Sequence, residues 1–363
     1  MSVASDGPRV ALVGPWPPPY GGVQTHLVAL RDGLRTAGAT VGVFNITRHR
    51  GTPGDGIYFP IGPLELLWQM MAFRPDVVHV HLGGDMTTRL IALLTACRLV
   101  FGRVVATVHS GGYPTSARAK NLTSSSPVGF VFRSLAHVIV VNAELKRLFE
   151  SIGVQPERIT ELVPTLGIPA AATTLPVDLA AFIGAADPLI VTVGLLEDEY
   201  LLPLQLDAFD RLTLAFPMAR FVIVGSGSRE MALRARLDGM AASRQVMLYG
   251  DMPHPVTIAL LQKASLLWRI TAYDGDSVSV REAIALETPV LATDNGMRPV
   301  EVQLTESNAE AIAAKSTAIL LGAIADRSAP RAIEARPAAV LVEHVEIVLT
   351  SASIARAWRM AAQ

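Results

Sequence analysis

Short apolar strands alternate with helical segments along most of the chain, and this alternation limits the possible folds more than any other feature. Helices are predicted at residues 23–37 and 63–73. The strands are predicted at residues 9–14, 40–45, 77–81, 104–109 and 138–142, and then at 189–193, 220–225, 246–249, 266–270 and 289–293. Alternation at this spacing is typical of parallel, doubly wound sheets. Because there are two such series, we expect an α/β protein of two domains.

The two series are separated by residues 165–187, which are rich in Pro and Ala and show no strong periodicity. We therefore predict a first domain at residues 1–170 and a second at 171–336. The tail, residues 337–363, has a helical pattern.

The balance of charge excludes one class of function. The 363 residues carry a formal net charge of −1, and a nucleic-acid-binding protein would show a basic excess, so no nucleic-acid partner is expected. The single cysteine, Cys97, cannot form an internal disulfide, which fits a reducing compartment. The N-terminal segment does not have the pattern of a signal peptide, so a cytoplasmic location is expected.

Half of the residues are hydrophobic, although no charge-free run reaches membrane-spanning length. Part of this apolar content belongs to strands that are buried on both faces of parallel sheets. Residues 64–73, LELLWQMMAF, have two interpretations. They pack into the core, or they contact a membrane, in which case the protein would act at the inner face of the cell membrane.

Residues 274–295, DGDSVSVREAIALETPVLATDN, predict an anion site. The small residues Gly275, Ser277 and Ser279 let backbone N–H groups approach an anion, and the helix that follows contributes its N-terminal dipole. Asp274 and Glu282 would repel a phosphate, but their carboxylates accept hydrogen bonds from sugar or ribose hydroxyls. A phosphate site between two hydroxyl acceptors predicts a nucleotide-sugar ligand.

Two other motifs follow predicted strands in the first half. Gly21 and Gly22 lie between the first strand and the first helix, where glycine allows close backbone approach to a phosphate or sugar. His109 ends a strand, and ligands of open α/β sheets bind beyond the carboxyl ends of strands. No Cys/His/Asp spacing typical of a metal site is present, so no metal is expected.

The 274–295 segment resembles the signature of the retaining glycosyltransferases of family 4. Their pattern is Glu, seven residues, Glu, then Ala-x-Ala-x-Gly-x-Pro-Val-x-Ala-(Ser/Thr)-Asp. Glu282 matches the second acid, Asp274 replaces the first, and residues 289–294, PVLATD, match the end. Glu287 replaces the usual Gly. The resemblance implies the GT-B fold, which has two facing Rossmann-like domains and a last helix that crosses back to the first domain.

The resemblance also implies roles for individual residues. Glu282 would accept hydrogen bonds from ribose, Asp274 from the donor sugar, and His109 would contact the transferred sugar or the acceptor. The implied donor-binding residues are Gly21, Gly22, Gly225, Gly275, Ser277, Val278, Ser279 and Glu282. No cofactor and no metal are implied, and the leaving diphosphate would take the proton of the acceptor.

One departure from the family pattern concerns the cations that stabilise the diphosphate. The family has Arg and Lys where this chain has Leu195 and Tyr200, and residues 197–199 are all acidic. Three arginines near the signature are the predicted substitutes, with Arg269 first because it lies at the carboxyl end of a strand; the others are Arg281 and Arg298.

The sequence therefore predicts a retaining, metal-independent glycosyltransferase of the hexosyltransferase type. It would take a nucleotide-diphosphate sugar as donor and a glycan, glycolipid or small molecule as acceptor, and it would serve in polysaccharide or glycolipid assembly. A non-catalytic subunit of the same fold, which binds a nucleotide sugar or partners another transferase, is the alternative that the lost Arg/Lys pair supports. A nucleotide-sugar epimerase or hydrolase on this fold is a third reading.

Overall fold

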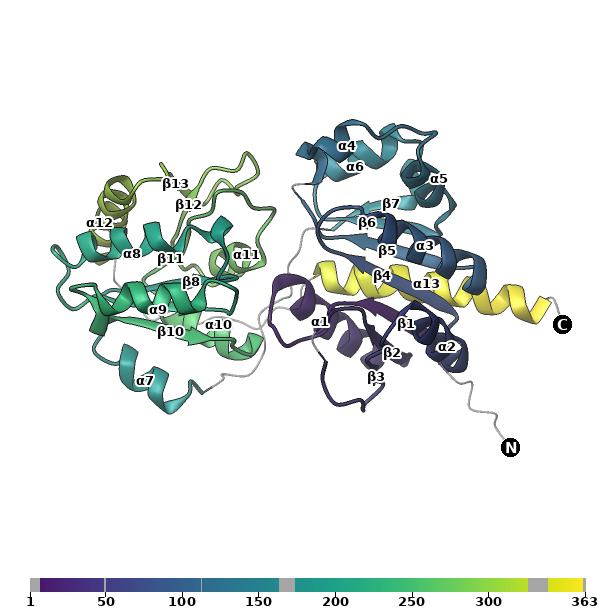
Figure 1. The fold of residues 1–363 in the computed structure, drawn as a ribbon, viewed down its shortest axis with the longest axis horizontal. Coiled ribbons are helices and arrows are strands. Elements are labelled where there is room, and N and C mark those ends of the chain that lie inside the picture. Colours follow the sequence, from purple (N-terminus) through teal and green to yellow (C-terminus); the bar gives the residue numbers. More distant parts are fainter. Residues whose placement is uncertain (1–6, 49, 112, 163–173, 326–338, 362–363) are drawn as a thin grey trace. The chain divides into compact units, whose positions relative to one another are not determined.

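The computed structural model describes residues 7–48, 50–111, 113–162, 174–325 and 339–361. The chain forms two compact units (Figure 1), each built on one sheet. The first unit comprises Met1–Pro18, Val23–Leu166 and Ala338–Gln363. The second comprises Pro19–Gly22 and Gly167–Pro337.

The sheet of the first unit has seven parallel strands in the order β3-β2-β1-β4-β5-β6-β7. The strands are β1 (Arg9–Gly14), β2 (Thr40–Asn45), β3 (Ile57–Tyr58), β4 (Val77–Leu82), β5 (Val104–Val108), β6 (His137–Val140) and β7 (Ile159–Glu161). The helices are α1 (Gly22–Thr36), α2 (Pro63–Phe73), α3 (Thr88–Phe101), α4 (Ala117–Lys120), α5 (Pro127–Ser134), α6 (Ala143–Ser151) and α13 (Ala339–Ala361), with short 3₁₀ turns at Tyr113–Thr115 and Pro156–Arg158.

Two layers of helices cover this sheet, because its central strands are buried on both faces. On one face, side chains of α1 and α13 such as Leu30 and Val348 pack with Leu12 of β1. On the other face, side chains of α2, α3, α5 and α6 share a second core with β4 and β5. The C-terminal helix α13 thus returns to the first unit (Figure 1), as the family resemblance implied.

The sheet of the second unit has six parallel strands in the order β10-β9-β8-β11-β12-β13. The strands are β8 (Leu189–Val193), β9 (Arg220–Val224), β10 (Val246–Gly250), β11 (Leu266–Arg269), β12 (Val290–Thr293) and β13 (Gln303–Thr305). The helices are α7 (Val177–Ile183), α8 (Leu202–Leu212), α9 (Glu230–Asp238), α10 (His254–Lys263), α11 (Val278–Ala285) and α12 (Ala309–Ala325), with 3₁₀ turns at Asp198–Tyr200 and Ser243–Gln245.

A buried tryptophan fixes one helical layer to this sheet. Trp268 of β11 is fully buried, and its ring packs edge-on against Phe221 of β9. Its Nε1–H donates to the hydroxyl of Ser316 on α12 at 2.9 Å, so the polar end of the ring is also satisfied. Trp268 therefore sets the packing of α12 behind the strand that leads into the predicted donor segment.

The predicted fold class, two α/β units with parallel sheets, is confirmed. All ten predicted strands are present with small differences at their ends, and β5 ends at Val108, which leaves His109 in the following loop. The short edge strands β3, β7 and β13 were not predicted. The predicted boundaries at residues 170 and 336 lie outside the described residues, as does Gly112 next to the His109 motif.

Two details bear on the predicted environment. Cys97 is buried on α3, and burial raises the pKa of its thiol to about 12, so it is an inert core residue. Among the helices that the structure describes, none combines the length and the apolarity that crossing a membrane requires.

The turn after β9 gives a test of this packing. Gly225 has a φ of +132°, and a Cβ built there would lie 1.8 Å from the backbone oxygen of Gly194. We expect Gly225→Ala to lower the free energy of unfolding by on the order of 3 kcal/mol, because strain and clash add. Urea denaturation measures this, with Gly322→Ala on α12 as control.

Gly322 is exposed and a Cβ there meets no atom within 4 Å, so this control should be neutral or stabilising by up to about 1 kcal/mol. Equal stability of the Gly225→Ala variant and the wild type would contradict the close approach of the two turns.

Candidate functional site

A buried arginine begins the predicted donor segment. Arg269 is the last residue of β11 and is 7% exposed. Its Nε and Nη2 donate to the two carboxylate oxygens of Asp274 at 2.7 and 3.1 Å, and its Nη1 donates to the backbone oxygen of Val193 at 2.6 Å. The guanidinium also lies over the ring of Tyr200, 4.9 Å from the centroid. Arg269, the first of the predicted substitutes for the family's cations, thus has a hydrogen-bond acceptor for each guanidinium nitrogen and an aromatic ring against its planar face.

Asp274 is the centre of this arrangement, because two arginines converge on it. Besides the two bonds from Arg269, its Oδ2 accepts from Nη1 of Arg298 at 3.0 Å and its Oδ1 accepts from the backbone N–H of Gly275 at 2.9 Å. A carboxylate offers about four lone-pair sites, and these four donors fill them. Asp274 could accept a hydrogen bond from a donor sugar only if one of these donors moved, so that role stays a prediction.

Arg298 joins the loop after β12 to the end of β11. Its Nη2 donates to the hydroxyl of Thr271 at 3.1 Å and its Nε donates to the backbone oxygen of Thr293 at 3.1 Å. The hydroxyl of Thr293 in turn accepts from the backbone N–H of Thr271 and donates to its carbonyl. Asp274, Arg269 and Arg298, the Asp274 cluster hereafter, together carry a net charge of +1.

Burial and charge act in opposite directions on the pKa values of this cluster. Burial by itself raises the pKa of Asp274, but the two guanidinium groups outweigh it and hold the pKa below its usual value. Burial by itself lowers the pKa of Arg269, but the carboxylate of Asp274 and the oxygen of Tyr200 raise it above its usual value. Arg269 and Asp274 therefore stay charged across the physiological range.

The predicted phosphate-binding residues lie at the start of α11. Ser277 is the N-cap residue, but its side chain makes no capping hydrogen bond and instead lies 3.1 Å from the hydroxyl of Ser279. Both serines are buried. Arg281, a predicted substitute cation, forms a bidentate pair with Asp276, so its charge is locally balanced.

Glu282 has a partner that the sequence did not suggest. Glu282 lies on α11 with 6% of its side chain exposed, and its Oε1 is 2.5 Å from Nε2 of His254. His254 is the first residue of α10, four residues after Gly250 at the end of β10. The imidazole fixes one oxygen of the carboxylate that is predicted to meet ribose.

Two of the three acidic residues near the predicted diphosphate position, Glu197 and Asp198, are also paired. Glu197 accepts from the backbone N–H and the hydroxyl of Ser228, and Asp198 forms an ion pair with Arg229. Glu197 and Asp198 thus bind residues of the turn after β9. Their negative charges are compensated there by the hydrogen bonds from Ser228 and the ion pair with Arg229. Gly225 in that turn allows the close approach to Gly194 described above, and its predicted contact with the nucleotide stays a prediction.

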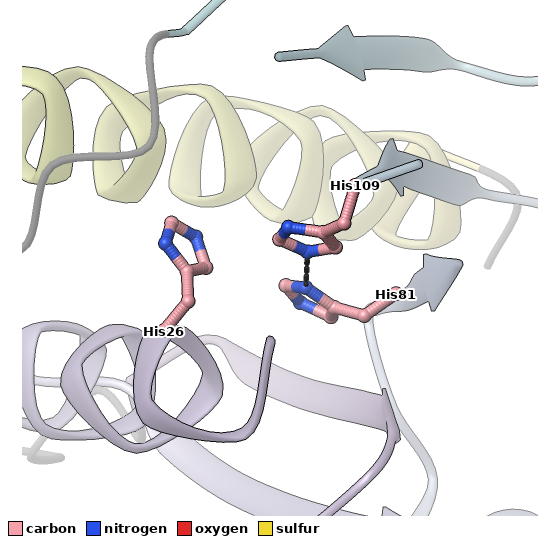
Figure 2. A group of neighbouring side chains, drawn as sticks. All are labelled: His26, His81 and His109. Carbon is pink, nitrogen blue, oxygen red and sulfur yellow. Dashed lines mark hydrogen bonds between the residues drawn. The ribbon is translucent and has the colours of Figure 1, made fainter. Parts of the chain in front are cut away.

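In the first unit, His109 belongs to a cluster of five histidines. These are His26 of α1, His79 and His81 of β4, His109 after β5, and His344 of α13. The rings of His81 and His109 are stacked, with Nδ1 of His81 3.0 Å from Nε2 of His109, and His26 reaches toward them from α1 (Figure 2). Gly22, which begins α1, stands one turn before His26, with Gly21 immediately before it.

The histidine cluster is neutral at physiological pH, because burial lowers the pKa of each ring. The pKa of His26 falls from 6.5 to about 4 and that of His79 to about 3. His109 is the most accessible of the five rings, since the other four are buried. An imidazole of this kind can accept or donate a hydrogen bond without carrying charge.

Both halves of the chain match models of known families. Residues 20–162 match the family described as Glycosyltransferase Family 4, and residues 181–331 match the glycosyl transferases group 1. The chain belongs to the family 4, group 1 glycosyltransferases. Among curated proteins, none matches the sequence of this glycosyltransferase significantly.

Several solved structures share the fold of this chain. HepE from Anabaena, solved in complex with UDP-glucose, is 15% identical with a TM-score of 0.64, covering 95% of this chain and 94% of that chain. Sucrose-phosphate synthase from Thermosynechococcus elongatus is 16% identical with a TM-score of 0.62, covering 98% and 100%. A glycosyltransferase from Rickettsia africae is 15% identical with a TM-score of 0.60, covering 96% and 93%. At these identities the likeness shows the fold.

The predicted site residues of this glycosyltransferase lie at the carboxyl ends of the strands in both units. Of these residues, His109 lies in the first unit. The second unit contains Gly21 and Gly22, at the start of α1, together with Gly225, Arg269, Asp274, Gly275, Ser277, Val278, Ser279 and Glu282. Sequence reasoning missed His254 as the partner of Glu282. The only signal was its place at the start of a helix, shortly after the Tyr249-Gly250 turn.

The buried histidines predict how the stability of the protein depends on pH. Unfolded His26 binds a proton near pH 6.5, whereas folded His26 binds one only near pH 4, so stability is complete above pH 6.5 and falls as the pH drops toward 4. His26 alone would contribute a loss on the order of 3 kcal/mol over that window. Urea unfolding at pH 7 and pH 5 measures it.

The variant His26→Gln removes this titration, so the difference in unfolding free energy between pH 7 and pH 5 should shrink by about 2 kcal/mol. An unchanged difference would show that His26 titrates normally in the folded protein.

Proposed function

We propose that this glycosyltransferase transfers a sugar from a nucleotide-diphosphate donor to a glycan or lipid-linked acceptor, with retention and without a metal. The observation that carries the proposal is the Asp274 cluster, which stands directly before the helix whose N-terminus is the predicted phosphate site. UDP-glucose in HepE, which shares the fold, supports a nucleotide sugar as the donor class.

The Asp274 cluster supplies the positive charge that the family obtains from other side chains. Two guanidinium groups share one carboxylate, so a net charge of +1 remains next to α11. Negative charge develops on the leaving diphosphate during donor cleavage, and fixed positive groups in a buried site stabilise it effectively. The helix dipole of α11 acts in the same direction. Arg269 and Arg298 would thus replace the cations missing at Leu195 and Tyr200.

The saturation of Asp274 also bears on the stereochemistry. A carboxylate that attacks the sugar needs a free lone pair, and the oxygens of Asp274 already accept from two arginines and a backbone N–H. Asp274 is therefore unsuited to form a covalent intermediate. Retention would instead follow from attack on the same face as the departing diphosphate, whose oxygen takes the acceptor's proton.

The non-catalytic reading has one observation in its favour. Tyr200, at the position of the family's Lys, lies against the guanidinium of Arg269 and would limit its reach toward a ligand. A protein of this kind would bind a nucleotide sugar and not cleave it. Product analysis with a glycan acceptor distinguishes the two, and retention is read from the anomeric configuration of the product by NMR.

The first prediction of the proposed function concerns donor binding. We expect one nucleoside diphosphate or its sugar to bind with micromolar affinity in calorimetry with EDTA present, because the proposed site uses no metal. Glu282→Ala should weaken binding by about 10- to 100-fold, since hydrogen bonds to a charged group contribute roughly 1.5–3 kcal/mol. The exposed Glu301→Ala is the matched control and should bind like the wild type.

His254→Ala should reproduce part of the Glu282→Ala loss, because it frees the carboxylate to move. Binding by the two variants that equals the wild type would remove Glu282 from the donor site.

Catalysis by the Asp274 cluster is the second prediction. We expect Arg269→Gln to lower kcat by about 10²- to 10³-fold, because it removes a charge that acts on the leaving group. Arg229→Gln, which breaks an exposed ion pair, is the control and should keep wild-type kcat. Circular dichroism and nucleotide binding establish that the variants fold. Normal kcat for a folded Arg269→Gln variant would refute the role of this cluster.

A lipid-linked acceptor is supported by an apolar stripe on α2. Leu64, Trp68 and Met71 of α2 are 84%, 64% and 50% exposed and recur at helical spacing, and Ile61, two residues before the helix, is 81% exposed. The opposite face of α2 buries Leu66, Met70 and Phe73, so core packing and surface exposure each apply to one face of the segment. Arg9 and Arg74 line a surface hollow with Trp68 and Met71. An aromatic and apolar stripe beside arginines suits an anionic membrane surface.

Membrane contact is the third prediction. We expect the protein to co-sediment with vesicles that contain phosphatidylglycerol, and Trp68→Glu to lower the bound fraction several-fold. Met231→Glu, at a position 83% exposed on α9, is the control and should bind like the wild type. Vesicle binding that Trp68→Glu leaves unchanged would exclude α2 as the contact.

A further inference from the structure

The histidine cluster contains more imidazole nitrogens than its internal hydrogen bonds can satisfy. Nδ1 of His26, Nδ1 of His79 and Nε2 of His81 are buried and have no hydrogen-bond partner among the described residues. Leaving a buried polar atom unpaired costs about 1–3 kcal/mol. Of these three, Nδ1 of His26 is available to a further ligand, because Nε2 of the same ring already contacts His344.

We propose that His26, His81 and His109 bind a zinc ion. They come from three elements, α1, β4 and the loop after β5, and converge within one unit (Figure 2). One ring nitrogen from each lies within 4.8 Å of the others. The sequence did not suggest this site, because its three ligands are far apart along the chain.

The spacing of the three nitrogens is close to what the ion requires. With Zn–N bonds of 2.0–2.1 Å, tetrahedral ligands are separated by roughly 3.3 Å. Nδ1 of His81 and Nε2 of His109 are already 3.0 Å apart, so this pair need only exchange its hydrogen bond for the ion. The ligand atom of His26 lies within 4.8 Å of the other two, so it has to approach them by at most about 1.5 Å to reach the tetrahedral spacing.

The chemistry of the donors selects the metal. Three imidazoles form the group, and no carboxylate or thiolate from the described residues joins it. Nitrogen donors suit zinc and its late transition-metal neighbours, whereas magnesium and calcium require oxygen ligands. Burial keeps the rings neutral, so their lone pairs are available without the release of protons from imidazolium.

The other two histidines, His344 and His79, belong to a hydrogen-bond network that begins at His26. Nε2 of His26 lies 3.0 Å from Nδ1 of His344, and Nε2 of His344 lies 3.2 Å from the hydroxyl of Thr107, which is 2.8 Å from Nε2 of His79. Ligating histidines are typically oriented by such outer hydrogen bonds. These hydrogen bonds link His26 on α1 to His344 on the C-terminal helix α13, which is one reason for α13 to pack on the first unit.

The site leaves one coordination position for a small molecule. Three protein ligands plus an exchangeable oxygen is the pattern of open zinc sites, and His109 is the ligand nearest to solvent. The proposal concerns the first unit alone, and the donor-binding residues that the proposed function requires in the second unit do not contribute to it. Zinc binding and donor binding are therefore tested independently. Coordination to the ion would replace only the predicted sugar or acceptor contact of His109, and the metal-free step proposed above concerns the donor diphosphate.

The test uses the full chain without a histidine tag, after removal of metals by EDTA and dialysis. Titration with Zn²⁺ in a calorimeter should give one equivalent, and Co²⁺ should give the intense visible absorption of tetrahedral coordination. His26→Ala and His109→Ala should each lower Zn²⁺ affinity by about 100-fold. His137→Ala is the control, since His137 contacts Thr160 at the edge of the sheet and should not affect binding.

The same experiment contains the results that would overturn the proposal. Absence of Zn²⁺ binding in the wild type would do so, as would binding that the His26→Ala and His109→Ala variants retain in full. The Co²⁺ spectrum of the wild type keeps the test decisive if a variant fails to fold, because the weak absorption of octahedral coordination would contradict the tetrahedral site proposed here.

Discussion

The carboxylate of Asp274 is the constraint on which the second unit depends, because it binds two buried arginines at once. Arg269 ends β11, Arg298 follows β12, and Asp274 lies between them on the way to α11. Removing this carboxylate would leave two like charges buried together, a loss that typically costs about 3–5 kcal/mol. The ion pairs therefore fix the ends of two central strands and the start of the helix that carries the predicted phosphate site.

The two units place polar side chains of different chemistry at the same edge of their sheets. In each, polar side chains gather beyond the carboxyl ends of central strands, where parallel sheets bind their ligands. The second unit uses charged groups, and their pairing leaves a net positive charge suited to an anion. The first unit uses neutral imidazoles, whose charged forms burial disfavours. The proposed anionic donor matches the environment of the second unit, and the proposed zinc ion matches that of the first.

The sequence predicted the strands well because most are buried on both faces and read as short apolar runs. The sequence did not predict β3, β7 and β13, because they are two or three residues long and lie at the edges of the sheets. Glu282 and Asp274 were identified from their spacing, but their partners were not. His254 is 28 residues from Glu282 and Arg298 is 24 from Asp274, and only the packing of neighbouring loops brings each pair together. The acidic residues 197–199 predicted repulsion of a diphosphate. In the structure, Ser228 donates hydrogen bonds to Glu197 and Arg229 forms an ion pair with Asp198, so two of the three negative charges have partners.

By itself, the sequence determined the fold class and the membership in the glycosyltransferase family, and it predicted a segment for the nucleotide sugar. These follow from local information: the alternation of strands and helices, and a signature whose residues are close along the chain. Only the tertiary structure decided that Arg269 is bound by Asp274, that Glu282 is oriented by His254, and that five histidines share one core. The last two depend on contacts between elements that parallel topology brings together from distant parts of the chain. Arg269 and Asp274 are only five residues apart, but their pairing depends on the conformation of the loop after β11, which the sequence pattern does not show. The periodicity of a sequence records which side chains are buried, but not which distant side chains they meet.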